Sequence, residues 1–229
     1  YSRPLAPSLG YNSVDENVGE LKNTGVEIDL KGTLIHTRDF MWRLGLNLTH
    51  YKNVVTDLPL KDMPVSGVHK LAVGRSVYDF YMKQWAGVDP ENGDPLWYKN
   101  VKDANDKITG RTTTNDYAQA DYYYTGKSSL PKVYGGFNTA FSYKGFELST
   151  IFAYSIGNYI VDRDVTMLWH NGSSTGRAWS TEILNRWTPE NRYTDVPALK
   201  TVSNSWNANS TRNLFNNSFL RMKNITLSY

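Results

Sequence analysis

The sequence predicts an all-β protein built from antiparallel strands, and three observations support this prediction. Apolar and polar residues alternate with a period of two in several segments of about ten residues. Short polar turns join some of these segments directly, as in β-hairpins. Elsewhere long polar connections separate them, and no apolar run approaches the ~18 residues of a membrane-spanning helix. A helical membrane protein is therefore excluded.

The first predicted hairpin joins strands 24–35 and 40–51 through the polar turn 36–39. Each strand alternates between apolar and polar positions. The apolar positions are Val26, Ile28, Leu30 and Leu34 in the first strand, and Phe40, Trp42, Leu44, Leu46 and Leu48 in the second. About ten residues per strand is the length that a tilted strand needs to cross a bilayer.

The second clear hairpin joins strands 132–143 and 146–155 through the turn 144–145. Its apolar positions include Phe137, Phe141, Phe146, Leu148 and Phe152. A further hairpin is predicted for strands 75–88 and 95–101, with unequal arms and a tight turn at 89–94.

The last predicted strand, 218–229, alternates least cleanly, because two charged residues share the parity of its apolar residues. These are Arg221 and Lys223, against Phe219, Ile225, Leu227 and Tyr229. A β-bulge, or a charged strand end at the level of the lipid headgroups, would reconcile this pattern with an apolar face.

The layout of about seven strands favours a membrane β-barrel over a soluble β-sandwich, which would show the same alternation. Tight turns alternate with long polar connections at about 53–75, 102–130 and 157–217. Short turns on one side and long loops on the other are typical of outer-membrane barrels. The ten residues predicted to face the membrane are Phe40, Trp42, Leu44, Leu46, Leu48, Phe137, Phe141, Phe146, Leu148 and Phe152. Because a bacterial barrel needs an even number of at least eight strands, seven strands cannot form a complete one.

Composition excludes other classes. The net charge of +3 comes from 25 basic and 22 acidic residues that are scattered together, whereas nucleic-acid binders concentrate their basic residues. The absence of cysteine excludes disulfides, thiolate metal sites and thiol catalysis. The N-terminal residues do not have the pattern of a signal peptide, so we expect any export signal to lie upstream.

We expect no catalytic residue, cofactor site or metal site in this segment. The GSSTG sequence at 172–176 fits a nucleophile motif around Ser174, but it lacks the required strand and helix, so a secreted hydrolase is a weak alternative. Acidic runs at 89–94 and 103–106 could hold Ca²⁺, although turns stabilised by Asp and Asn side chains are favoured. The four histidines lack the close spacing of a metal site.

The most suggestive binding feature is a set of tryptophans among Asn, Ser, Thr and Arg in the long loops. Indole rings stack on sugar rings or peptide side chains, and neighbouring amides and hydroxyls suit a polar oligomer. The candidate ligand-binding residues are Trp169, Trp179 and Trp206. Packing of the loops against each other is the alternative role.

From about residue 17 onward, six stretches resemble, in the same order, the C-terminal part of the barrel of SusC/RagA-type TonB-dependent outer-membrane transporters. They are NVGELKNTGVEIDL at 17–30, FMWRLGLNLTHYKNVVTDL at 40–58, VGRSVYDFYMKQWAGVDPENGDPLWY at 73–98, LPKVYGGFNTAFSYKGFELSTIFAYSIGNY at 130–159, RWTPEN at 186–191 and SFLRMKNITLSY at 218–229. Single stretches such as RWTPEN are weak, but six in order are specific.

The resemblance implies that residues 1–229 are a partial segment of one plugged barrel domain of 22 strands. The plug domain, the part that contacts TonB and the final closing strands are then expected outside this sequence. It also implies import of oligosaccharides or peptides across the outer membrane of a Gram-negative bacterium, together with a SusD-like surface lipoprotein. The turns 36–39, 89–94 and 144–145 are expected on the periplasmic side. The alternative is a soluble or surface-attached β-rich module, a glycan-binding protein or adhesin, for which detergent would not be required.

Overall fold

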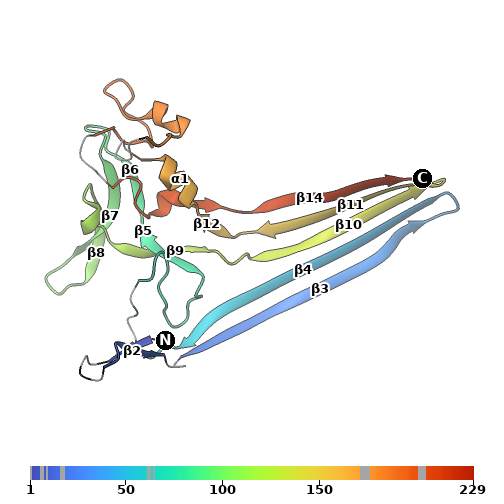
Figure 1. The fold of residues 1–229 in the computed structure, drawn as a ribbon, viewed down its shortest axis with the longest axis horizontal. Helices are drawn as coiled ribbons and strands as arrows, with labels where there is room; N and C mark the ends of the chain where they lie inside the picture. Colours follow the sequence, from blue (N-terminus) through green and yellow to red (C-terminus); the bar gives the residue numbers. More distant parts are fainter. Residues whose placement is uncertain are drawn as a thin grey trace. The chain divides into compact units, whose positions relative to one another are not determined.

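Five long strands form one antiparallel sheet in the computed structural model, in the order β14, β11, β10, β4, β3 (Figure 1). The structure describes residues 2–5, 8, 10–15, 19–60, 63, 65–170, 176–200 and 205–229. Each of the five strands matches one that alternation predicts, and the antiparallel all-β fold is confirmed. They are β3 (Glu20–His36), β4 (Phe40–Asp57), β10 (Val133–Tyr143), β11 (Phe146–Ile156) and β14 (Phe219–Ser228).

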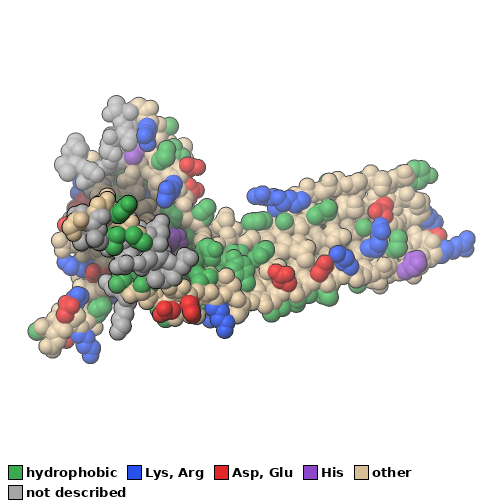
Figure 2. Space-filling model, turned by 60° about the horizontal axis from the view of Figure 1, so that its bottom comes forward, with side chains coloured by type: hydrophobic (Ala, Val, Ile, Leu, Met, Phe, Trp, Pro, Cys, Tyr) green, Lys and Arg blue, Asp and Glu red, His purple; other side chains and the backbone are tan. Residues whose placement is uncertain are grey.

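The pairing register gives this sheet two faces of opposite character. Leu46 on β4 lies opposite Phe137 on β10, whose ring stacks on Phe152 of β11 with 4.6 Å between centroids. On the other face Asn47 lies opposite Asp29, and Figure 2 shows acidic and basic side chains spread along these strands. All ten residues predicted to face the membrane share the apolar face: Phe40, Trp42, Leu44, Leu46, Leu48, Phe137, Phe141, Phe146, Leu148 and Phe152.

A β-bulge explains the irregular pattern of the last strand. Ile151 pairs with Asn224, but the next residue, Phe152, pairs with Met222, so Lys223 is an extra residue in β14. The bulge shifts the parity by one position. The predicted bulge is therefore confirmed, and it places Leu220, Met222, Ile225 and Leu227 on one face. Phe219 was expected among these apolar residues, but it pairs with Ser155 and lies on the other face with Arg221.

A second register shift corrects the apolar face predicted for β3. Thr33 pairs with Arg43, whereas Ile35 pairs with Trp42. Leu34 is the additional residue between them, and Ile35 takes the position opposite Trp42 on the apolar face. Strict alternation cannot show a bulge when two neighbouring residues are both apolar.

The chain divides into two units. The long-strand unit comprises Tyr1–Asp79, Pro131–Ile156 and Phe219–Tyr229, and the short-strand unit comprises Phe80–Leu130 and Gly157–Ser218. The long-strand unit contains the five-stranded sheet. It also contains a small antiparallel pair formed by β1 (Ser2–Pro4) and β2 (Ser13–Asp15).

The short-strand unit is built from small sheets and short helices. The boundary between the units falls inside β5, because its first residue, Asp79, belongs to the long-strand unit. One sheet pairs β5 (Asp79–Lys83) with β9 (Tyr122–Ser128), a second contains β6 (Trp85–Val88), β7 (Pro95–Lys102) and β8 (Ile108–Thr114), and a third pairs β12 (Tyr159–Val161) with β13 (Leu214–Asn216). The helices are α1 (Arg163–Leu168) and the 3-10 helices η2 (Tyr117–Gln119), η3 (Thr181–Asn185) and η4 (Thr211–Asn213).

Two predicted strands lie outside the five-stranded sheet. Residues 75–88 and 95–101 form parts of β5, β6 and β7 in the small sheets, because β4 pairs directly with β10. The turn 89–94 therefore joins the short strands β6 and β7, and the prediction that it joins two strands of the long-strand sheet was wrong. Period-two alternation arises in any sheet with one buried face, so it cannot separate short strands from membrane-crossing ones.

Within the described part of the chain, no helix is long and apolar enough to cross a membrane.

Gly135 marks a close approach of two long strands and gives a first prediction. A Cβ atom at Gly135 would lie 2.2 Å from the backbone oxygen of Asn47 on β4. Gly135→Ala is expected to destabilise the protein by about 1–3 kcal/mol, because a backbone must shift to make room. Gly32→Ala is the control, since a Cβ atom there meets nothing within 4 Å. The two variants should be compared by thermal unfolding of the full-length protein, and equal stability would contradict this pairing of β4 with β10.

Candidate ligand-binding site

Arg212 of the short-strand unit lies among three indole rings. Its guanidinium carbon is 4.3 Å from the ring centre of Trp169, 5.1 Å from that of Trp85 and 5.6 Å from that of Trp206. A guanidinium within about 6 Å of an aromatic face is attracted to the electrons of the ring. The stacking therefore holds the side chain of Arg212 against aromatic groups.

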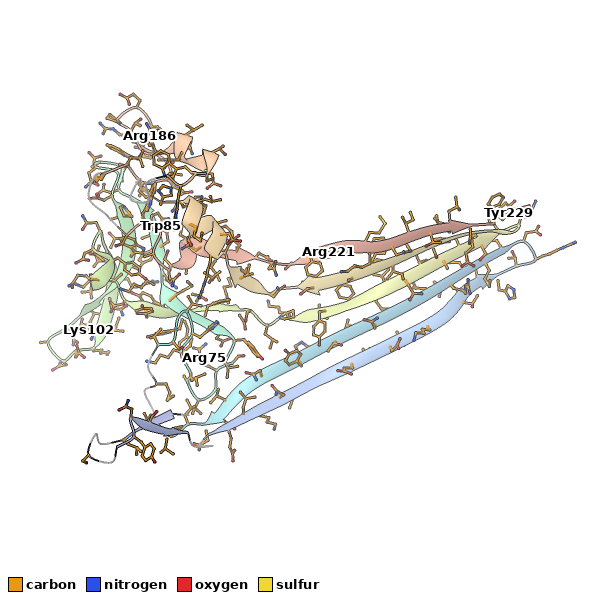
Figure 3. The ribbon with its side chains drawn as sticks, in the orientation of Figure 1. Arg75, Trp85, Lys102, Arg186, Arg221 and Tyr229 are labelled. Carbon is orange, nitrogen blue, oxygen red and sulfur yellow. The ribbon has the colours of Figure 1, made fainter. Side chains whose placement is uncertain are left out.

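Local hydrogen bonds fix the helix η4 that carries Arg212. Ser210 caps this helix by accepting a hydrogen bond from the Arg212 backbone N–H at 3.4 Å. The backbone N–H of Trp85 donates to the hydroxyl of Thr211 at 3.0 Å. The backbone N–H of Asp162 donates to the backbone carbonyl of Asn213 at 3.1 Å. The first bond ties η4 to β6, whose first residue, Trp85, is labelled in Figure 3. The second bond ties η4 to the N-terminus of α1.

Burial lowers the pKa of Arg212 to about 10, and the nearby carboxylates Glu182 and Asp195 oppose this shift. Arg212 therefore stays protonated at neutral pH. Its Nη1 atom is buried and has no hydrogen-bond partner among the described residues. Among the ion pairs within 4.0 Å in the described part of the chain, none involves Arg212, Glu182 or Asp195.

These groups line one cavity of about 530 Å³. This volume falls in the range of about 300–1,000 Å³ that is usual for small-molecule pockets. The walls combine aromatic and aliphatic surface with charged and amide groups, and they come from β6, η3, η4, β13 and the segments around 169 and 195. The lining residues are Trp85, Trp169, Glu182, Asn185, Asp195, Val196, Arg212 and Phe215.

The three predicted ligand-binding tryptophans have different positions. Trp169 lines the cavity. Trp206 is only 2% exposed and packs near Arg212 without lining the cavity. Trp179 also lies outside the lining, and its indole Nε1 donates to Nδ1 of His170 at 2.8 Å. Sequence analysis missed Trp85 and Arg212, since Trp85 was assigned to a membrane strand and no local motif surrounds Arg212.

The other candidate sites show turn chemistry. Asp89 accepts hydrogen bonds from the Glu91 N–H at 2.9 Å and from Nδ2 of Asn92 at 3.1 Å, as in an Asx-turn. Asp103 accepts from the backbone N–H of residues 105 and 107. Among the residues that the structure describes, no three His, Asp or Glu side chains gather as metal ligands. Ser174 of the GSSTG motif lies outside the described residues.

No protein-family model matches the chain. TonB-dependent receptor P3 of Formosa agariphila is 26% identical over 244 residues, which cover 100% of this chain and 24% of that receptor. TonB-dependent receptor SusC of Bacteroides thetaiotaomicron is 27% identical over 228 residues, which cover 93% of this chain and 21% of SusC. Neither relative is named as an enzyme.

Solved structures of RagAB agree with these relatives. The RagAB peptide transporter matches with a TM-score of 0.79, and the RagAB peptide importer in its "closed-closed" state matches with a TM-score of 0.80. Both are 31% identical, and each match covers 98% of this chain and 24% of the matched chain. The chain thus spans about a quarter of the length of the proteins that it matches. It is similar over its whole length to SusC/RagA-type TonB-dependent receptors and corresponds to part of a larger β-barrel.

Proposed function

We propose that this chain forms part of an outer-membrane transporter of a Gram-negative bacterium that imports oligosaccharides or peptides. The observation that carries the proposal is the structural match to the RagAB peptide importer over 98% of the chain. The sheet of the long-strand unit adds physical support, because its apolar face suits lipid and its polar face suits an aqueous lumen. The protein then acts in transport and not in catalysis.

Each part of the described structure has a role in this proposal. The sheet edges β3 and β14 pair with further strands of the same barrel, since an open edge in lipid would leave backbone groups unpaired. A SusD-like lipoprotein closes over the loops from outside, and TonB supplies energy through parts of the protein beyond this chain. Residues 36–39 and 144–145 face the periplasm in this proposal.

Uptake by whole cells tests the proposal. A strain that lacks the gene is expected to lose uptake of at least one fluorescently labelled oligosaccharide or peptide, and the intact gene should restore it. The full-length polypeptide is expected in the outer-membrane fraction and should need detergent for extraction. Unchanged uptake of both substrate classes, or a polypeptide that is soluble without detergent, would instead support the adhesin or glycan-binding alternative.

A further inference from the structure

The cavity beside Arg212 carries an uncompensated negative charge. Arg212 contributes one positive charge, whereas Glu182 and Asp195 contribute one negative charge each. Arg212 stays protonated at neutral pH although burial lowers its pKa. Neither carboxylate belongs to an ion pair among the described residues. A bound group with one positive charge would therefore neutralise the cavity.

The remaining lining restricts the chemistry of that group. Trp85, Trp169 and Phe215 supply aromatic surface, and Val196 supplies aliphatic surface. The side-chain oxygen of Asn185 already accepts a hydrogen bond from Nδ2 of Asn191 at 3.2 Å, so its amide nitrogen is the group that can donate to a ligand. An acidic ligand would face two carboxylates, and a neutral sugar would leave the excess charge in place. The lining instead suits a cation that is attached to a partly apolar, amide-containing molecule.

We propose that this cavity binds the primary ammonium group of a short peptide. The inference rests on the proposed import function and narrows its substrate class. The three N–H donors of an ammonium group match the carboxylate acceptors of Glu182 and Asp195. A neighbouring peptide carbonyl can accept a hydrogen bond from Arg212, whose guanidinium donates no hydrogen bond within the described structure. Side chains of the peptide pack against the aromatic walls.

Calorimetric titration of the purified full-length protein in detergent tests this assignment. The probes are tetra-alanine amide, its N-acetylated form, and an N-acetylated tetrapeptide amide with one lysine. Acetylation is expected to weaken binding of tetra-alanine amide about tenfold or more, as charged hydrogen bonds are lost. Restored affinity of the lysine peptide would identify a side-chain ammonium as an equally good ligand, whereas continued weak binding would identify the peptide N-terminus.

Matched variants locate the effect. Combining Glu182→Gln with Asp195→Asn preserves shape and should weaken binding of tetra-alanine amide about tenfold, while the acetylated peptide should be unaffected. Glu190→Gln is the control, because this exposed carboxylate does not line the cavity. The acetylation experiment uses the unaltered protein, so it remains decisive if a variant folds poorly.

Three outcomes would overturn the inference: equal affinity for the free and acetylated peptides, an equal loss in Glu190→Gln, or tighter binding of the neutral sugar cellotetraose than of tetra-alanine amide. Different measurements test the ammonium-binding inference and the proposed import function, so one can be wrong while the other holds. Calorimetry detects binding without transport, whereas the whole-cell assay detects uptake whichever part of the protein holds the substrate.

Discussion

Replacing Trp97 with Ala is expected to destabilise the short-strand unit by about 3–5 kcal/mol. The side chain of Trp97 is 0% exposed, and its ring packs edge-on against Trp85 at 5.8 Å and against Tyr117 at 5.2 Å between centroids. Its Nε1 atom has no hydrogen-bond partner within the part of the chain that the structure describes, so the expected loss is one of packing. Pulse proteolysis of the full-length protein in urea, with mass spectrometry of the fragments, would measure the stability of this unit.

Tyr193→Ala is the control for loss of an aromatic ring, because the Tyr193 side chain is 93% exposed. Its expected effect lies within about 0.5 kcal/mol. Trp97→Phe should fall between the two, since it keeps an apolar ring but leaves part of the volume empty. Equal protease resistance in Trp97→Ala and Tyr193→Ala would mean that Trp97 does not anchor the unit.

The long strands could be predicted from the sequence because their environment imposes one simple rule. In a sheet with one apolar and one polar face, apolar and polar side chains alternate along each strand. Leu44, Leu46 and Leu48 keep this alternation without interruption. The same rule failed between residues 75 and 101, where short strands bury one side against their own unit. There Phe80 and Met82 are buried, as they would be in any small β-sheet.

The candidate cavity could be predicted only in part. Trp169 was identified because an indole among polar loop residues suggests binding. Trp85 and Arg212 are far apart in the sequence. A β-bridge between Lys83 and Ser210 and the hydrogen bond from the backbone N–H of Trp85 to Thr211 bring their segments together. The excess negative charge likewise depends on which carboxylates share the cavity with Arg212. Contacts of this kind follow from tertiary packing, and composition or spacing cannot reveal them.

The assignment of lipid and lumen faces leads to the second large expected effect. Phe152→Arg is expected to destabilise the assembled barrel by about 2–4 kcal/mol if the apolar face contacts the middle of the bilayer. Phe152 stacks on Phe137 and lies opposite Met222, so its replacement puts a charge among apolar neighbours. The folded fraction in outer membranes, measured by the altered gel mobility of unheated protein, should fall sharply.

Ile151→Arg is a closely matched control. Ile151 is also apolar, adjoins the same β-bulge and is 50% exposed, but it lies on the opposite face between Asn138 and Asn224. An arginine there can reach water in the lumen, so the folded fraction should stay near that of the unaltered protein. The reverse ranking of the two variants would show that the apolar face points inward, and equal tolerance of both would show that neither face contacts lipid.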